Sequence, residues 1–408
     1  MSPLGVVITI VLVDLLGFTV VMPLLPRFAQ RFDLDGWQIG LLFAAYPLCQ
    51  LIAGPILGRL SDRYGRRPVL IVSQAGTAIS FLMLGLAHSF PMMLLARALD
   101  GASGGNILVA QAYVADVTAP RDRARGLGLI GMAFGVGFVL GPLLGGLLLG
   151  LPVSDDLRLR IPFLVGAGFS TIAWVLVLTR LPESLPTDLR SRERARVLSV
   201  HGLVETLTRP AIGLLVAVGF LIVLSFAALE GTFSLFLRAR LGWDAQEAAF
   251  GFVFLGLVSA AVQGGLIRPL VPRFGERRLI LTGIVALCAG MAMIAGVSGL
   301  ASLLVATLVV AIGQGLVSPT LSGLISKVTP PSEQGAVFGT LSSAQTLARM
   351  LSYLVANTLL DQVGPSAPYW LGCAIAATAL VVASIGCRRV ASQIHMSESN
   401  QIDVGVPV

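Results

Sequence analysis

Long apolar runs alternate with short polar segments along nearly the whole chain. Each run contains about 18 or more residues, which is enough for one α-helix to cross the hydrocarbon core of a bilayer. Because hardly any residues separate successive runs, we expect no separate soluble domain. We place twelve transmembrane helices at residues 4–26, 39–58, 69–88, 91–116, 127–150, 161–180, 210–232, 246–268, 279–297, 300–326, 336–360 and 368–387.

The composition agrees with an all-α membrane protein. Hydrophobic residues make up 55% of the 408 positions and charged residues only 12%, whereas a soluble protein has about 25% charged residues. The first run has no basic segment before it and is too long for the core of a signal peptide, so we interpret it as a retained helix. The four cysteines lack the spacing of metal ligands, so we expect free thiols and no metal site.

Basic residues lie mainly on one side of the predicted membrane. With both termini on the cytoplasmic side, that side receives 20 of the 28 Lys and Arg residues, the other side receives 6, and Arg97 and Arg349 fall within spans. This bias follows the positive-inside rule. The net charge of +7 therefore indicates orientation in a membrane, and no nucleic-acid partner is expected.

Two halves of the chain repeat the same landmarks. VTAPRDRARGLG at 117–128 matches VTPPSEQGAVFG at 328–339, and Gly65 matches Gly275 at nearly the same offset. A Gly-Trp pair also precedes the second span of each half. Repeated six-helix halves with a site between them are typical of secondary transporters. We expect an N-terminal bundle at 1–180, a cytoplasmic linker at 181–209, a C-terminal bundle at 210–389 and a cytoplasmic tail at 390–408.

Four segments carry a family resemblance. GRLSDRYGRRP (58–68) resembles the signature between the second and third helices of the major facilitator superfamily, and ARALDGASGG (96–105) resembles its motif in the fourth helix. GVGFVLGPLLGG (135–146) is similar to the fifth-helix signature of its drug/proton antiporters, and VLVDLLGFTVVMPLLP (11–26) to the first helix of tetracycline/proton antiporters. The resemblance implies the twelve-helix major facilitator fold, a monomer in a bacterial inner membrane, and export driven by the proton gradient without a cofactor.

The segment from residue 58 to 68 has two interpretations. Its arginines alone are a topology anchor, and Gly58 and Gly65 permit a tight turn. The resemblance favours a conformational latch between moving helices, which breaks when the protein opens inward. In the second half, Pro272 and Glu276 stand at the positions of the first two latch side chains, so we expect the latch only in the first half. The predicted latch consists of Asp62, Arg66, Arg67 and Asp116.

Glycines at a spacing of four mark one face of the fifth predicted helix. Gly137, Gly141 and Gly145 share this face, and small residues at that spacing let two helices approach closely. Pro142 removes a backbone donor and bends the helix. The motif predicts close helix packing that seals one side of the molecule, and its resemblance favours export over uptake.

Charged residues inside the predicted spans are candidates for proton coupling, because a charge at the bilayer centre costs about 2.5–3.5 kcal/mol. These residues are Asp14, Arg97, Asp100 and Glu230. Asp14 has no nearby partner in the sequence and is the favoured proton carrier. Arg97 and Asp100 lie on one helix face. Simple neutralisation of one charge by the other is the alternative to a role in proton coupling. Glu230 lies towards the outer end of its span, where an interfacial position is the alternative.

Polar residues in other spans are candidates to line a substrate cavity. The set is Asn106, Gln111, Gln314, Gln345 and Arg349. Hydrogen bonding between helices is the alternative for the four amides, and Arg349 either pairs with an acid across the halves or binds an anionic substrate. Ser80 and Leu287 replace two acids of the tetracycline antiporters, so tetracycline itself is not the expected substrate.

These features predict a transporter rather than an enzyme. We expect proton-coupled export of small amphipathic compounds, with a proton symporter or facilitator for a specific metabolite, such as a sugar or organic ion, as the alternative. An ATP-driven pump is excluded because no phosphate-binding loop ending in Gly-Lys is present. Residues 101–104 have the GxSG form of a serine protease around Ser103, but no histidine lies near it in the predicted topology to act as a base.

Overall fold

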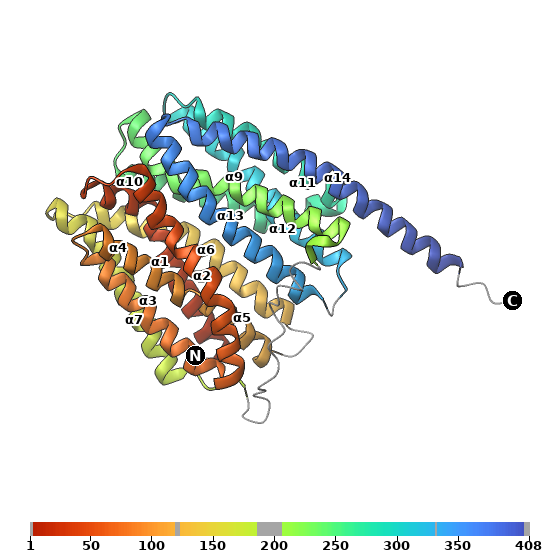
Figure 1. Ribbon diagram of the computed structural model, residues 1–408, viewed down its shortest axis with the longest axis horizontal. Helices are drawn as coiled ribbons and strands as arrows, with labels where there is room; N and C mark the ends of the chain where they lie inside the picture. Colours follow the sequence, from red (N-terminus) through yellow and green to blue (C-terminus); the bar gives the residue numbers. More distant parts are fainter. Residues whose placement is uncertain (1–2, 119–122, 186–205, 331–332, 404–408) are drawn as a thin grey trace.

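The computed structural model describes residues 3–118, 123–185, 206–330 and 333–403. Regular structure within these ranges is helical (Figure 1). Most of the predicted linker, at 186–205, lies outside the described residues, as do 404–408 of the predicted tail. The helices are α1 Pro3–Gln30, α2 Gly36–Tyr64, α3 Arg66–Gly85, α4 Phe90–Ser103, α5 Asn106–Val117, α6 Arg123–Leu149, α7 Asp155–Arg180, α9 Pro210–Leu241, α10 Ala245–Ala261, the π-helix η2 Val262–Leu266, α11 Ile267–Ala295, α12 Leu300–Val328, α13 Gln334–Gln362 and α14 Ala367–Asp403.

The fourth predicted span is a broken helix rather than one continuous helix. α4 ends at Ser103, and α5 begins at Asn106 after two glycines. The carbonyl groups freed by the break are satisfied from neighbouring helices, since Ser73 donates its hydroxyl to Ser103 O and Gln50 donates to Gly104 O at 3.0 Å. Broken backbone inside a membrane protein is tolerated only where such partners are available.

Two expected loops are single-residue turns. α2 continues through Gly58 to Tyr64, and the chain reverses at Gly65, whose φ is 106°. α11 contains the equivalent turn at Gly275, whose φ is 73°. Only glycine adopts such angles at low cost. Gly58 lies inside a helix, so its predicted role in the turn is wrong.

The repeat in the sequence is also visible in the helix starts. α2 follows Asp35, whose backbone N–H donates to Gln38 Oε1 at 2.9 Å. α10 follows Asp244, whose backbone N–H donates to Glu247 Oε2 at 2.8 Å. Both pairs are halves of a capping box, which satisfies backbone donors that the first helical turn leaves unpaired. The second helix of each half is therefore started by the same local chemistry.

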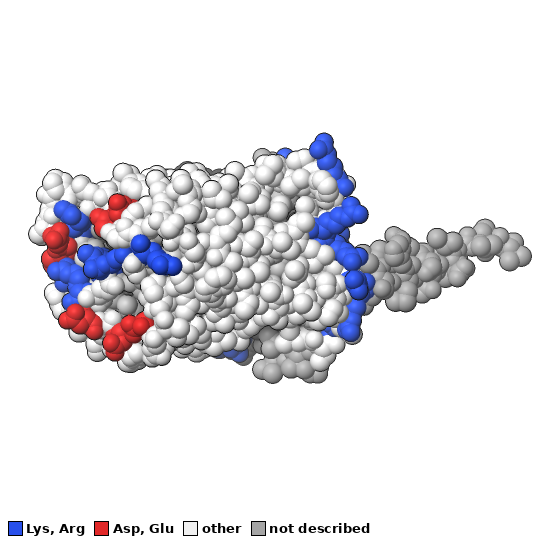
Figure 2. All heavy atoms as spheres, turned by 90° about the horizontal axis from the view of Figure 1, so that it is seen from above, with Lys and Arg blue, Asp and Glu red and all other residues white. Residues whose placement is uncertain are grey.

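Charged residues gather at the two ends of the molecule, and the belt between them is uncharged on the face that Figure 2 shows. One end, here called the basic end, carries the turns at Gly65 and Gly275 and both ends of the described chain. The opposite end carries cations and acids together. In the described residues, nine helical segments are long and apolar enough to cross a membrane, and one of them, at Ala245–Ala295, contains both α10 and α11.

Helices α1 to α7 and helices α9 to α14 touch mainly towards the opposite end. There Gly36 and Gly40 of α2 lie so close to α13 that a Cβ on Gly40 would be 2.8 Å from Tyr353 O. Towards the basic end, a Cβ on Gly58 of α2 or on Gly339 of α13 would meet nothing within 4 Å. The two halves therefore diverge from the opposite end to the basic end.

Buried apolar side chains follow the same pattern. One cluster near the basic end contains only residues of the first half, among them Tyr113 and Val177. A second cluster joins Phe43 of the first half to Tyr353 of the second. The third lies in the second half and includes Met22 of α1. Among the described residues, the hydrophobic core is thus shared between the halves only away from the basic end.

The glycine stripe of α6 packs against α1. A Cβ on Gly141 would lie 1.9 Å from Thr19 Oγ1, and one on Gly137 would lie 2.8 Å from Leu15 Cβ. Thr19 also donates to Gly137 O at 2.8 Å across the two helices. At Gly145 the corresponding distance is a looser 3.3 Å, to Leu24 Cδ1. Because a side chain would overlap at two of the three positions, the stripe is required for the close approach of α1 and α6.

Pro142 exposes a carbonyl group to the other half. A proline at this position has no N–H for the carbonyl of Phe138. Gly256 of α10 covers that carbonyl, and a Cβ on Gly256 would be 2.9 Å from Phe138 O. The α6 and α10 crossing therefore depends on a proline in one half and a glycine in the other.

Candidate substrate and proton site

A buried ion pair occupies the first half near the middle of the bundle. Arg97 Nη1 of α4 lies 2.8 Å from Asp100 Oδ2, and the two side chains are 2% and 8% exposed. The guanidinium also lies over the ring of Tyr46, 4.9 Å from its centroid. The mutual neutralisation considered from the sequence is confirmed as a contact. Each charge compensates much of the desolvation cost of the other.

A second ion pair lies in the other half. Arg349 Nε of α13 contacts Glu230 Oε2 of α9 at 3.0 Å. Tyr353 donates its hydroxyl to the same carboxylate oxygen at 3.1 Å. Glu230 is buried, so the interfacial alternative is wrong. Arg349 pairs with an acid of its own half and not across the halves.

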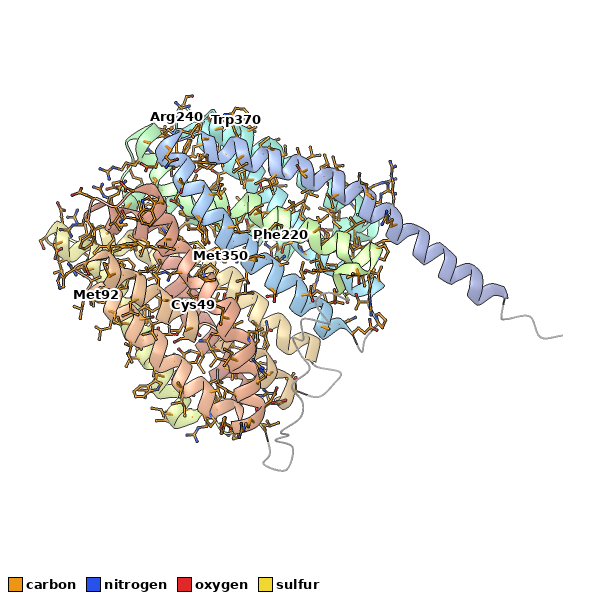
Figure 3. All side chains as sticks on the ribbon, viewed as in Figure 1. Cys49, Met92, Phe220, Arg240, Met350 and Trp370 are labelled. Atoms are coloured by element: carbon orange, nitrogen blue, oxygen red, sulfur yellow. The ribbon has the colours of Figure 1, made fainter. Side chains whose placement is uncertain are left out.

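The two ion pairs face each other across the boundary between the halves. Phe43 of α2 packs on Tyr353 of α13, with ring centroids 5.2 Å apart. Figure 3, which labels Cys49 on α2 and Met350 on α13, shows these two helices side by side through the centre of the molecule. Arg349 lies one helical turn from Tyr353 towards the basic end, where α2 and α13 begin to separate.

Asp14 of α1 belongs to a third polar group. Asn106 Nδ2 donates to Asp14 Oδ2 at 2.6 Å, and Gln74 Nε2 donates to the same oxygen at 3.1 Å. Asp14 therefore has partners that the sequence did not reveal. Asp14 Oδ1, Gln74 Oε1 and Asn106 Oδ1 are buried and have no hydrogen-bond partner in the described residues. A carboxylate whose own buried oxygen has no hydrogen-bond donor is chemically suited to taking up a proton at that oxygen.

The remaining cavity candidates occupy different environments. Asn106 is buried and is engaged with Asp14. Gln314 is half-buried, and its Oε1 has no partner in the described residues. Gln345 and Gln111 are also half-buried. Gln345 Nε2 lies near Gly219 of α9, so it faces the interior of the second half.

The two positions that lack the acids of the tetracycline antiporters are also buried. Ser80 donates to Thr77 O at 2.8 Å in its own helix. Leu287 is fully buried and belongs to the apolar core of the second half. Neither position offers a charge to a substrate.

The predicted latch residues meet at the basic end. Arg66 contacts Asp62 at 2.7 Å and Asp116 at 3.1 Å. Arg67 does not join this ion-pair network, since its Nη2 donates to Leu178 O at 2.7 Å. Glu183, which sequence reasoning missed, accepts from the backbone N–H groups of Arg66 and Arg67 at 2.9 and 3.2 Å and so caps α3.

This network differs from the expected latch in one respect. Its members all belong to the first half, on α2, α3, α5 and the segment after α7. It is intact although the halves are apart at this end. Separation of the halves leaves it unstrained because no member belongs to the second half, so its direct effect is to hold four elements of one half together.

The second half has a matching pair with reversed charges. Lys327 of α12 contacts Glu276 of α11. These residues occupy the positions of Asp116 and Arg66 in the repeat, at offsets of 211 and 210. The second half therefore has a counterpart of the Arg66–Asp116 contact, but it remains asymmetric because Pro272 offers no charge in place of Asp62. The sequence analysis compared each position separately. It did not consider that both charges had changed sign together, which preserves the attraction between Lys327 and Glu276.

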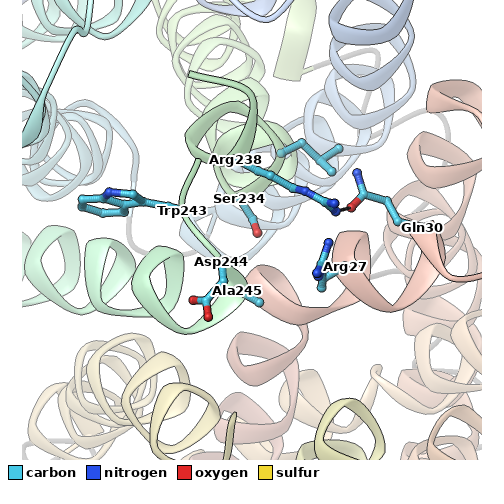
Figure 4. Close-up of a pocket in the computed structure, with 8 residues that line it drawn as sticks. Arg27, Gln30, Ser234, Arg238, Trp243, Asp244 and Ala245 are labelled. Carbon is cyan, nitrogen blue, oxygen red and sulfur yellow. Dashed lines mark hydrogen bonds between the residues drawn. The ribbon is translucent and has the colours of Figure 1, made fainter. Parts of the chain in front are cut away.

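A charged cavity of about 690 Å³ opens at the opposite end. Arg27, Arg158 and Asp155 line it from the first half, and Arg238 and Asp244 from the second. Two of its lining residues, Arg238 of the second half and Gln30 of the first, form a hydrogen bond between the halves (Figure 4). This cavity could not be predicted from the sequence, because its walls come from the ends of five helices, α1, α6, α7, α9 and α10.

Sequence reasoning also missed Tyr46, Gln74 and Tyr353 around the ion pairs. Gln74 is a polar residue in a predicted span, so the criterion that selected the other amides was sufficient to find it. The two tyrosines carry no such signal, because a tyrosine in a span is equally suited to the apolar core. Their contacts with Arg97 and Glu230 depend on helix packing.

The sequence is similar to those of bacterial drug resistance proteins over most of its length. The tetracycline resistance protein, class B, of Escherichia coli is 28% identical over 375 residues, which is 91% of each chain. Multidrug resistance protein 2 of Bacillus subtilis (strain 168) is 28% identical over 363 residues, covering 86% of this chain and 87% of the relative.

Solved structures share the fold. The human organic anion transporter MFSD10 (TETRAN) has a TM-score of 0.70 at 27% identity, covering 93% of this chain and 98% of that one. The nucleoside transporter NupG has a TM-score of 0.77 at 14% identity over 95% and 99% of the two chains, which concerns the fold alone. The family model of the Major Facilitator Superfamily matches residues 7–272 and 261–394. Since these matches span almost the whole chain and the helices have the arrangement expected of the fold, the chain belongs to the Major Facilitator Superfamily.

Proposed function

We propose that this protein exports small amphipathic compounds in exchange for protons. The observation that carries the proposal is the pair of acid–arginine contacts inside the bundle, one on either side of the boundary where the halves diverge. Charged side chains inside a membrane protein mark substrate or proton pathways, and the midplane between two repeated halves is the usual substrate position. The names of the tetracycline and multidrug resistance relatives support export of drug-like compounds.

In this mechanism the halves rock about the central site. The close packing of α6 in the first half on α10 in the second supports the seal at the opposite end in the present conformation. Substrate enters from the basic end, and closure of that end accompanies opening of the other. Asp14 takes up a proton when the opposite end is open and releases it to the basic end, which compensates the work of moving the substrate.

The orientation follows from charge. The basic end faces the cytoplasm under the positive-inside rule, so both termini are cytoplasmic and the present conformation opens inward. The host membrane is a bacterial inner membrane, consistent with the bacterial relatives. The partners are the substrate, protons and lipid. The protein acts as a monomer, catalyses no covalent chemistry and uses the proton gradient in place of a cofactor.

Proton release from inverted membrane vesicles tests this function. Addition of a transported drug to energised vesicles should dissipate the pH gradient, which a pH-sensitive dye reports. Asp14→Asn should abolish the response, because an amide cannot carry the proton, and Asp14→Glu should retain part of it. Asp35→Asn is the matched control, because Asp35 is exposed, does not line the charged cavity, and asparagine caps a helix as well as aspartate does. Drug transport without proton movement, or full activity of Asp14→Asn, would refute antiport.

The alternative transport modes predict a different direction of flux. A symporter accumulates its substrate with protons moving the same way, and a facilitator shows no proton movement. The serine protease interpretation lacks a base within the described residues, because His88 lies at the opposite end beside Arg160 while Ser103 is buried in the middle of the bundle.

A further inference from the structure

The guanidinium of Arg349 is only partly used by its ion pair. Its Nε contacts Glu230 Oε2 at 3.0 Å. In the described residues, its two terminal nitrogens, Nη1 and Nη2, have no hydrogen-bond partner. Arginine binds carboxylates best through two parallel N–H groups. The terminal edge of this side chain is therefore an unoccupied fork for a planar anion.

Exposure distinguishes Arg349 from the other paired charges in the middle of the bundle. Its side chain is 30% exposed, while Glu230 behind it is 2% exposed. In the first half, Arg97 and Asp100 are 2% and 8% exposed. Asp14 is not comparable, because its Oδ2 accepts two amide hydrogen bonds and its Oδ1 is buried. Of the paired charges within the bundle, the one that a substrate can reach is positive.

The position of Arg349 places this exposure between the halves. Tyr353, one turn towards the opposite end, is covered by Gly40 and Phe43 of α2. Gly58 of α2 and Gly339 of α13, further towards the basic end, have no neighbour within 4 Å. Arg349 thus lies at the apex of the opening between α2 and α13. A molecule that enters from the basic end meets its terminal nitrogens before the shielded acids.

We propose that Arg349 binds the anionic group of the substrate through its terminal nitrogens, and that Glu230 holds the arginine when no substrate is bound. This makes carboxylate-bearing amphipathic compounds the preferred substrate class. The inference rests on the proposed transport function and narrows its substrates. Glu230 Oε1 is buried without a partner in the described residues, so Glu230 uses one oxygen and leaves the fork free.

The test uses two dyes that differ only in the charged group. Rhodamine 110 has a free carboxylate, and rhodamine 123 is its methyl ester. Binding of each to the purified full-length protein in detergent is measured by fluorescence anisotropy. We expect wild-type protein to bind rhodamine 110 more tightly. Arg349→Gln should weaken that binding by roughly 10- to 100-fold, as for loss of hydrogen bonds to a charged group, and should change rhodamine 123 binding little.

Further variants separate binding from folding. Arg349→Lys keeps the charge but loses the fork, so rhodamine 110 affinity should be intermediate. Glu230→Gln removes the internal competitor and should tighten rhodamine 110 binding. The double variant Arg349→Gln with Glu230→Gln leaves no unpaired buried charge, so it tests the site even where the single variant fails to fold. It should bind the two dyes about equally.

Two outcomes would overturn the inference. One is wild-type protein that binds the ester as tightly as the acid. The other is a double variant that retains the wild-type preference for rhodamine 110. These measurements need no proton gradient, so the two proposals fail separately. A failure of proton exchange in vesicles refutes the exporter but does not decide this site. Loss of dye discrimination refutes the site but does not decide the exporter.

Discussion

Two equivalent ion pairs at the basic end carry their charges in opposite order: the acid and the base have exchanged helices between the two halves. Arg66 with Asp116 in the first half and Glu276 with Lys327 in the second link equivalent helices. A pair of opposite charges attracts equally whichever helix carries the cation. Comparison of Arg66 with Glu276 alone suggested that the second half had lost the ion pair. The contact is present because Lys327 replaces Asp116 at the same time.

The pair in the second half should tolerate exchange of its charges. Lys327→Asp places an acid beside Glu276 and should lower thermal stability in detergent. The double variant Lys327→Asp with Glu276→Arg should recover most of the loss. Because Lys327 is exposed, the coupling is expected to be about 0.2–1 kcal/mol, typical of an exposed pair. A double-mutant cycle of unfolding midpoints measures it, and additive losses would show that the two residues do not interact.

Helices in this protein approach each other most closely where glycines remove the side chain. On α6, Gly141 lies against Thr19, while Gly135, less than two turns away, would accept a Cβ without meeting any atom within 4 Å. The difference arises because Gly141 is on the face towards α1. Gly135 belongs to the same sequence motif, so the motif alone does not tell which glycines are required.

Substitution of these two glycines should give different results. Gly141→Ala introduces a methyl group where no space exists and should destabilise the protein by about 1–3 kcal/mol, the usual cost of overpacking. Gly135→Ala should be neutral or slightly stabilising, because alanine favours the helix. Thermal unfolding and transport of both purified variants provide the comparison. Equal tolerance of the two substitutions would show that α1 and α6 are not held together by this contact.

For the molecule as a whole, the conformation depends on contacts at one end. Arg238 and Gln30 meet there, and Gly36 N donates to Asp361 Oδ2 at 3.1 Å. These polar contacts join the halves alongside the apolar packing of Phe43 on Tyr353. The ion-pair network of Asp62, Arg66 and Asp116 lies within one half and does not join it to the other.

Engineered disulfides should lock the present conformation. In a variant with the four native cysteines replaced, cysteines at positions 30 and 238 should cross-link readily under mild oxidation and stop transport until a reductant is added. Cysteines at positions 58 and 339 should cross-link only during turnover, when the basic end closes. Cross-linking of the second pair in the resting protein, as fast as that of the first, would contradict the arrangement described for the halves.

The amino-acid sequence by itself determined the transmembrane helices, the division into repeated halves and the distribution of charge between the two ends. These properties are local, because a helix in hydrocarbon satisfies its own backbone and needs only about 20 apolar residues. The break at Gly104 escaped this reasoning, since hydropathy does not register backbone angles, whereas the turn at Gly65 was expected because glycine tolerates its positive φ.

Only the tertiary structure decided which buried charges meet. Glu230 and Arg349 are 119 positions apart, and Asp14 finds Gln74 and Asn106 on two other helices. Such contacts depend on how each helix is rotated about its axis and packed. A helix with apolar residues on every face does not reveal which face points inward. The exposure of Arg349 likewise follows from the angle between the halves, a property that no single helix contains.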